Sequence, residues 1–224
     1  ADNNGSNFQN WMFKRHAGFD VVTYKGTGAA RQIPHSLSKT PEMMWVKNRD
    51  SSSDWQVYHK NGNNSNSNDP ELFYLKLDQT SPAYSATDRW NQIAPTAACF
   101  SIGSATQTNN SGDSFIAMLF ASVDGMSKCG GYSGGSSDLD LELGFAARFF
   151  LTKRINQTGS WCVYDTLRGI ATGNDKRLFL NTNDAQTEAD YVDPYSNGIT
   201  LVAGVSDFTY STSSSDKYIF YAHA

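Results

Sequence analysis

An internal repeat restricts the folds that this chain can adopt. Residues 46–58, VKNRDSSSDWQVY, match residues 152–164, TKRINQTGSWCVY, at an offset of 106 residues. Downstream, residues 72–75, LFYL, align with residues 177–180, RLFL, and the segment that begins at Asp113 aligns with the one that begins at Asp216. A repeat of roughly 100 residues is one folding unit, so the chain is expected to form the same structure twice.

Within each copy, hydrophobic and polar residues alternate with the period of a half-buried β-strand, as in residues 138–143, DLDLEL. Strands are expected in the first copy near residues 20–25, 30–33, 42–49, 54–59, 72–77, 98–102 and 114–121, with counterparts in the second. Their number and spacing suit a β-sandwich, and no stretch keeps helical periodicity over about ten residues. The sequence therefore predicts an all-β fold of two tandem antiparallel β-sandwich units.

The same alignment sets the expected boundaries. The first sandwich should span residues 18–122 and the second residues 126–224. Residues 7–13, NFQNWMF, resemble the segment that closes each copy. Residues 1–17 are therefore expected to be the last strand of a preceding unit, or a strand that pairs with the first unit, and the natural protein is expected to extend further toward its N-terminus.

Composition and charge exclude some classes of binding partner. The net charge is −4 and no run of Lys or Arg offers a footprint for phosphates, so nucleic acid is not an expected partner. No apolar run approaches the ~20 residues that span a bilayer, so membrane insertion is not expected. The three cysteines, Cys99, Cys129 and Cys162, are an odd number without close spacing, and they are interpreted as small core hydrophobes. One disulfide with a free thiol, or a contact between subunits, remains an alternative.

The motifs that suggest catalysis are weak. Residues 131–135, GYSGG, fit the nucleophile turn of serine hydrolases, but no helix is expected after Ser133, so a hairpin turn explains the glycines better. Asp54 and Asp165 flank the repeated tryptophan segment and are the nearest candidates for a glycosidase pair, yet Ser160 replaces Asp54 in the second copy. No catalytic residue and no enzymatic activity are expected.

Metal ligands are equally sparse. The histidines stand far apart, at His16, His35, His59 and His223. They have no spacing that would place two imidazoles on one zinc ion. Asp138, Asp140 and Glu142 share one face of an expected strand and form the one weak candidate, for calcium, against the alternative of a solvated outer face. No cofactor is expected.

The aromatic residues give the most information about the core and about candidate binding sites. Trp55 and Trp161 recur at one place in the repeat and are expected to anchor the equivalent interiors of the two copies. The candidate binding residues are aromatics in polar loop segments, namely Tyr84, Trp90, Tyr191 and Tyr195. Exposed rings there would stack on sugar faces while Asn, Asp and Ser bond the hydroxyls, and packing within the loops is the alternative.

Together these residues resemble a known family. The blocks are FQNWMFKRHAGFDVVTYKGTG at 8–28, PEMMWVKNR at 41–49, DWQVYHK at 54–60, GDSFIAMLFASVDG at 112–125 and YDTLRGI at 164–170. As a set they resemble the C-terminal repeats of tailed-bacteriophage tail-fibre proteins, many from marine and cyanobacterial phages. The resemblance covers nearly the whole chain, departs from the usual AP at His16-Ala17, and transfers no catalytic residue.

The resemblance implies a non-enzymatic structural protein of the virion, a distal tail-fibre module that attaches to a host receptor. It implies a homotrimer in contact with other tail proteins, assembled in the host cytoplasm, where unpaired cysteines persist, and carried on the extracellular particle. Surface polysaccharide is the expected receptor, with surface protein as the other choice. Aromatic and small polar groups suit adaptable recognition, and several fibres multiply weak contacts. A spacer or capsid decoration without receptor binding, and a polysaccharide depolymerase, are the alternatives.

Overall fold

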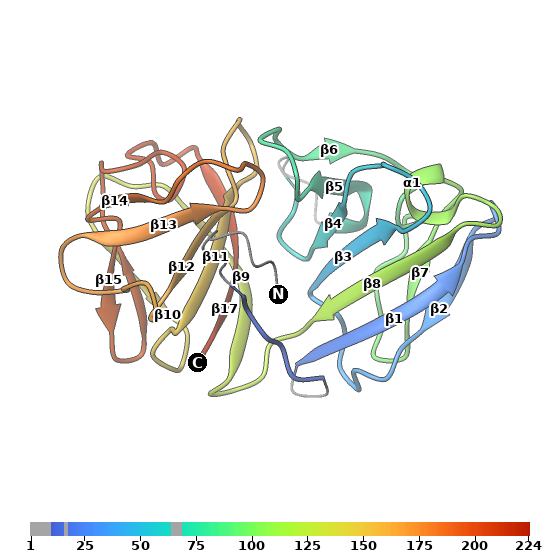
Figure 1. Ribbon diagram of the computed structural model, residues 1–224, viewed down its shortest axis with the longest axis horizontal. Coiled ribbons are helices and arrows are strands. Elements are labelled where there is room, and N and C mark those ends of the chain that lie inside the picture. Colours follow the sequence, from blue (N-terminus) through green and yellow to red (C-terminus); the bar gives the residue numbers. More distant parts are fainter. Residues whose placement is uncertain (1–9, 16–17, 64–68) are drawn as a thin grey trace, which may run out of the picture.

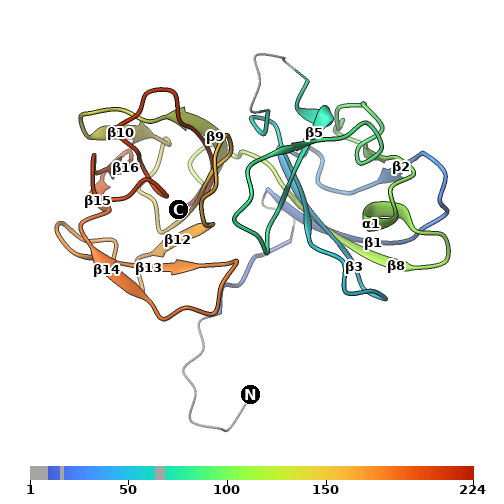
Figure 2. The ribbon, with the colours of Figure 1, turned by 90° about the horizontal axis from the view of Figure 1, so that it is seen from above.

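A computed structural model describes residues 10–15, 18–63 and 69–224, and their regular structure is almost entirely β. Figure 1 and Figure 2 show two lobes side by side, one built from the first half of the chain and one from the second. Each lobe is an antiparallel β-sandwich with one six-stranded sheet and one smaller sheet. The predicted fold class, tandem sandwiches related by an internal repeat, is confirmed.

The first sandwich lies within residues 19–120. Its six-stranded sheet has the order β1 (Phe19–Lys25), β8 (Ser114–Phe120), β3 (Met43–Asn48), β4 (Gln56–His59), β5 (Phe73–Lys76) and β6 (Tyr84–Ser85). Its second layer is the pair β2 (Arg31–Pro34) and β7 (Cys99–Ile102). Two single turns of helix, η1 (Pro70–Leu72) and α1 (Thr106–Asn109), lie in the connections.

The second sandwich lies within residues 127–223 and repeats this order. Its six-stranded sheet runs β9 (Ser127–Ser133), β17 (Lys217–His223), β11 (Phe149–Arg154), β12 (Cys162–Asp165), β13 (Asp175–Phe179) and β14 (Thr187–Ala189). Its second layer has three strands, β10 (Leu139–Glu142), β16 (Gly198–Leu201) and β15 (Val192–Tyr195).

Strand register shows how closely the copies correspond. Met43 pairs with His59 in the first sandwich and Phe149 with Asp165 in the second, both at the offset of 106 found in the sequence. One part of the sequence alignment is wrong. Leu75 pairs with Val57 and Leu178 with Val163, so residues 72–75 correspond to 175–178 rather than 177–180. A shift by two keeps every side chain on its own face, so the hydrophobic pattern did not reveal the error.

Each sandwich has its own core between its two layers. In the first, Ile33, Phe100 and Ile102 of the small sheet pack on Met44 and Leu119 of the large one. In the second, the small-sheet residues Val192, Ile199 and Leu201 belong to one core with large-sheet residues such as Phe150 and Tyr164.

A third core joins the opposite faces of the two six-stranded sheets, and we call it the seam. The first sandwich contributes Phe19, Met43, Val57, Phe73, Leu75, Leu77, Ala83 and Phe120 to it, and the second contributes Cys129, Phe149, Leu151, Ile155, Trp161, Val163, Ile219 and Tyr221. Because alternate residues of a strand point to opposite faces, strands covered on both faces are buried throughout. All residues of β4, β11 and β12 are buried accordingly, so the prediction of half-buried strands was wrong for these three strands.

The seam also changes the interpretation of the repeated tryptophans. Trp161 is 1% exposed and is a core anchor, but the core is the seam rather than the interior of its own sandwich. Its Nε1 donates a hydrogen bond to the Lys76 carbonyl of the first sandwich at 2.9 Å. Trp55 packs against the same core and is only partly buried. The sequence could not distinguish the two faces of the inner sheets, because both are apolar.

The described part of the N-terminal segment, residues 10–15, contains no strand and runs between the two lobes (Figure 1). Trp11 and Phe13 pack against the seam, and the Phe13 ring lies 5.7 Å from Phe120 and 6.0 Å from Phe149. Residues 10–15 of the expected terminal strand therefore cover the seam and do not pair as a strand. Residues 1–9, 16 and 17 lie outside the described residues.

The cysteines fit the interpretation as core residues in part. Cys129 and Cys162 are buried, Cys99 is half-buried, and all three are free thiols. Among the helices of the described residues, none has the length and apolar character that a membrane crossing requires.

Candidate binding surfaces

Two of the four predicted binding aromatics are core residues. Trp90 is 1% exposed, its Nε1 donates to the Phe73 carbonyl at 2.9 Å, and its ring meets Tyr58 edge-on. Tyr191 is buried, with the Arg177 guanidinium 4.0 Å from its ring centroid. The interpretation of these two rings as exposed stacking surfaces was wrong, because their polar segments fold back and insert the rings into the cores of the sandwiches.

The other two lie nearer the surface, as expected. Tyr195 ends β15, and its hydroxyl donates to Glu142 Oε1 at 2.6 Å, a hydrogen bond that raises the pKa of the phenol. That contact ties Tyr195 to β10 and occupies its hydroxyl. Tyr84 on the edge strand β6 is 37% exposed and is the predicted residue best placed to meet a ligand.

Tyr84 belongs to a cluster that we call the aromatic edge, made of Asp54, Tyr74, Lys76, Tyr84 and Arg89. Tyr84 stacks on its cross-strand neighbour Tyr74 with ring centroids 5.4 Å apart and planes at 23°. The Lys76 ammonium lies 5.4 Å from the Tyr84 centroid and 2.8 Å from Asp54 Oδ2. The Arg89 guanidinium lies 4.7 Å from the Tyr74 centroid. Cation–π attraction holds the rings in place, so the edge presents a fixed ring beside charges of both signs.

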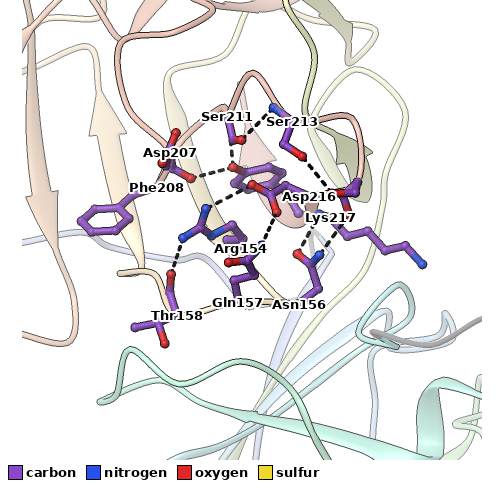
Figure 3. A network of polar contacts seen from close by, with 12 residues as sticks. Arg154, Asn156, Gln157, Thr158, Asp207, Phe208, Ser211, Ser213, Asp216 and Lys217 are labelled. Atoms are coloured by element: carbon purple, nitrogen blue, oxygen red, sulfur yellow. Dashed lines mark hydrogen bonds and ion pairs between the residues drawn. The ribbon is translucent and has the colours of Figure 1, made fainter.

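A second surface lies on the loops of the second sandwich, where a polar network holds residues 207–217 (Figure 3). Arg154 Nη1 is 3.1 Å from Asp216 Oδ2, and Gln157 Nε2 donates to Asp216 Oδ1 at 3.1 Å. Tyr218 donates its hydroxyl hydrogen to the Asp207 carbonyl at 2.6 Å. These bonds tie the loop to β11 and β17, so it has a defined shape although it lacks a regular strand.

This loop presents an exposed aromatic that the sequence analysis missed. The Phe208 ring points away from Arg154 (Figure 3). It meets Phe179 edge-on, with ring centroids 6.2 Å apart. It borders a hollow of about 370 Å³ lined by residues 204–208. Within the described part of the chain, the Asp207 carboxylate receives no hydrogen bond. The position of Phe208 between Asp207 and a Thr/Tyr/Ser run was the available signal.

The candidate calcium ligands do not converge. Asp138 Oδ1 accepts from the Ala203 amide at 2.9 Å, Asp140 Oδ1 accepts from Thr200 Oγ1 at 2.5 Å, and Glu142 is bound to Tyr195. All three are exposed, Asp140 and Glu142 on β10 and Asp138 directly before it. Among the described residues no group of three or more His, Cys, Asp or Glu is arranged to hold a metal ion. The calcium candidate was wrong, since these carboxylates accept hydrogen bonds at separate points of the outer face.

The weak catalytic candidates lie at different elements of the fold. Ser133 ends β9 on the surface and turns into a loop, with no helix beginning there. Asp54 forms its ion pair with Lys76, and the buried Asp165 forms one with Arg168 at 2.7 Å. Each carboxylate is thus held by a cation of its own.

Of the histidines, His59 has the most distinctive surroundings. It is buried at the seam, where Nδ1 accepts from the Asn61 amide at 3.0 Å and Nε2 therefore donates to the Phe220 carbonyl at 3.1 Å. Burial lowers its pKa to about 4. His223 stacks on Phe149, His35 lies beside Thr96, and His16 is outside the described residues. These surroundings make His59 a structural link between the sandwiches.

The fold and these surfaces define a class, a double β-sandwich with a shared inner core and loop-borne aromatic surfaces. Residues 2–224 match the model of a family described as "Domain of unknown function (DUF7483)", and the chain belongs to this family. Comparisons with curated proteins and with solved structures find no match.

Proposed function

We propose that the protein is a non-enzymatic module of a bacteriophage tail fibre that binds a glycan on the host surface. The observation that carries the proposal is the aromatic edge, where the exposed Tyr84 ring is braced by Tyr74 and flanked by the Lys76–Asp54 pair. An aromatic face beside hydrogen-bonding groups is the usual composition of a sugar site. The Phe208 loop offers the same combination with Asp207 and Ser206.

Other features agree with binding without turnover. The carboxylates nearest the repeated tryptophans, Asp54 and Asp165, are each held in an ion pair. The proposal includes a virion location, assembly in the host cytoplasm, a homotrimer and contact with other tail proteins, all implied by the resemblance to tail-fibre repeats. Several fibres on one particle would multiply a weak contact at each site.

A glycan array with the purified protein tests this function, followed by titration of the best ligand. Tyr84→Ala should weaken binding about fivefold, since one stacked ring contributes roughly 1 kcal/mol. Tyr84→Phe keeps the ring and should bind within about twofold of the wild type, which makes it the matched control. Unchanged affinity in Tyr84→Ala would remove the aromatic edge from the site, and an absence of any glycan ligand would oppose the function itself.

One observation favours the second candidate, a structural spacer or virion decoration. Met12 is 93% exposed and Leu167 is 81% exposed, and both border a hollow of about 330 Å³ with Trp11 and Phe149. Large apolar side chains grouped on a surface mark protein contacts. A Met12→Ser/Leu167→Ser variant that binds glycan normally but no longer enters particles would support an assembly role for this surface. Normal incorporation would argue against it.

A further inference from the structure

The repeat places one position of each sandwich in the same surroundings and fills it differently. Asn48 ends β3 opposite Phe115, and Arg154 ends β11 opposite Tyr218. Two residues before each partner stands a carboxylate, Asp113 in the first sandwich and Asp216 in the second. Asn48 and Arg154 are therefore equivalent, and each binds the equivalent aspartate.

In the second sandwich a guanidinium occupies this place. Arg154 Nη1 contacts Asp216 Oδ2 at 3.1 Å, and Nη2 donates to the Thr158 carbonyl at 2.6 Å (Figure 3). The two side chains are 11% and 3% exposed, so the pair is almost fully enclosed. Gln157 completes the coordination of the carboxylate. This copy of the repeat is thus built around a bound guanidinium.

In the first sandwich the shorter residues leave a hollow of about 220 Å³. Asn48 stands in place of Arg154, and Ser51 stands in place of Gln157 at the same offset of 106. The residues that line it are all of polar types, namely Asn48, Ser51, Ser53, Thr106, Gln107, Asn110 and Asp113. Asp113 Oδ2 accepts from the Asn48 and Asn110 amides at 2.7 and 2.8 Å. The nearby Lys47 ammonium is bound to the Ser51 and Ser53 carbonyls and does not line the hollow.

We propose that this hollow binds a guanidinium group, supplied by an arginine side chain of a partner protein, in the place that Arg154 fills in the second sandwich. The lining offers one carboxylate with hydroxyl and amide oxygens around it, which suits the five N–H donors of a guanidinium. It contains no aromatic ring on which a sugar could stack, so its chemistry differs from that of the aromatic edge. The site is independent of the proposed glycan binding.

Titration of the full chain with N-acetyl-arginine amide, followed by amide NMR, tests the site. Saturable shifts of the Asn48, Gln107 and Asn110 side-chain amides are expected, with lysine and glucosamine analogues binding at least about tenfold more weakly, because neither presents a planar fork. Asn48→Arg supplies the missing guanidinium within the chain and should abolish binding of the probe.

Asp113→Asn should reduce affinity for the probe at least about tenfold, since the charge-assisted bond is lost. Asp124→Asn, at an exposed carboxylate outside the hollow, is the matched control and should bind like the wild type. Wild-type binding by both Asn48→Arg and Asp113→Asn would overturn the proposal, as would glucosamine binding as tightly as the arginine probe. Tyr84→Ala should leave arginine binding unchanged, so failure here and failure of the glycan function are distinguishable.

Discussion

The two sandwiches have one strand order and one register, yet they fill equivalent positions with different chemistry. Position 48 is an asparagine beside a hollow, whereas its equivalent is the enclosed Arg154. Trp161 is fully buried in the seam, and its equivalent Trp55 is only partly buried. His59 binds across the seam, and its equivalent Asp165 binds Arg168. The backbone of a duplicated fold thus constrains which face a residue occupies, while the role of the residue follows from its neighbours.

The largest expected effect concerns the equivalent tryptophans. Trp161→Ala should cost about 3–5 kcal/mol of unfolding free energy, because it leaves a cavity in the seam and an unsatisfied Lys76 carbonyl. Trp55→Ala should cost only about 1–2 kcal/mol, because part of that ring is already in water. Urea denaturation of both variants measures the difference. Equal losses would contradict the unequal burial of the two residues.

The two aspartates that bind Asn48 and Arg154 should also contribute unequally to stability. Asp216→Asn leaves the enclosed Arg154 without its counter-charge and should destabilise by about 3 kcal/mol. Asp113→Asn loses amide hydrogen bonds at a half-open site and should cost about 1 kcal/mol. Thermal unfolding at constant pH compares them. A larger loss for Asp113→Asn would mean that the hollow is more tightly coupled to the core than the filled site.

Acid should lower the stability of the folded chain through His59. Its pKa is lowered from 6.5 to about 4 by burial, so between these values the unfolded chain binds a proton that the folded chain does not. Stability is therefore retained above pH 6.5 and lost as the pH falls, by about 2–3 kcal/mol at pH 4.5. His59→Gln should lack this component, so the difference between the variant and the wild type should change by that amount from pH 7 to pH 4.5.

Asp175 has the opposite effect on the pH dependence of stability. The contribution of His59 is therefore obtained by comparing His59→Gln with the wild type. Burial raises the pKa of Asp175 from 3.8 to about 6, so the folded chain binds the extra proton between these values and acid stabilises it. The total stability of the wild type therefore does not report His59 alone, since Asp175 acts in one direction and Glu42, whose pKa is lowered by its bonds to Lys60 and Ser122, acts in the other. A parallel pH dependence of His59→Gln and the wild type would contradict the buried, neutral histidine.

The smallest effect is expected at the aromatic edge. Tyr84→Ala should lower the unfolding free energy by less than about 1 kcal/mol, because the ring is partly exposed and lies on a two-residue edge strand. Trp90→Ala, in the core nearby, should cost about 3–5 kcal/mol. Calorimetry of both variants separates a binding ring from a core ring. Similar losses would mean that Tyr84 also serves the core.

Much of the fold could be predicted from the sequence, because alternation and repetition are local signals. The expected strand near residues 42–49 corresponds to β3, Met43–Asn48, and the one near 114–121 to β8, Ser114–Phe120. The seam could not be predicted, since it depends on two sheets that each have two apolar faces. The two-residue error after position 72 has the same cause, because alternation is unchanged by a shift of two.

The candidate surface could be predicted only in part. Tyr84 was identified correctly as a surface aromatic, but Trp90 and Tyr191 stand in equally polar segments and are buried. Local composition does not tell whether a loop folds back over a core. Phe208 and the hollow at Asn48 depend on contacts between segments far apart in the sequence, Phe179 with Phe208 and Asn48 with Asp113.

The seam is central to this structure, and hydrogen exchange of the full chain in increasing urea measures it most directly. Peptides from β4 of the first sandwich and β12 of the second should lose protection at one common urea concentration, because their buried side chains share a core. Two separate midpoints, one for each sandwich, would contradict the shared core and would mean that the sandwiches unfold independently.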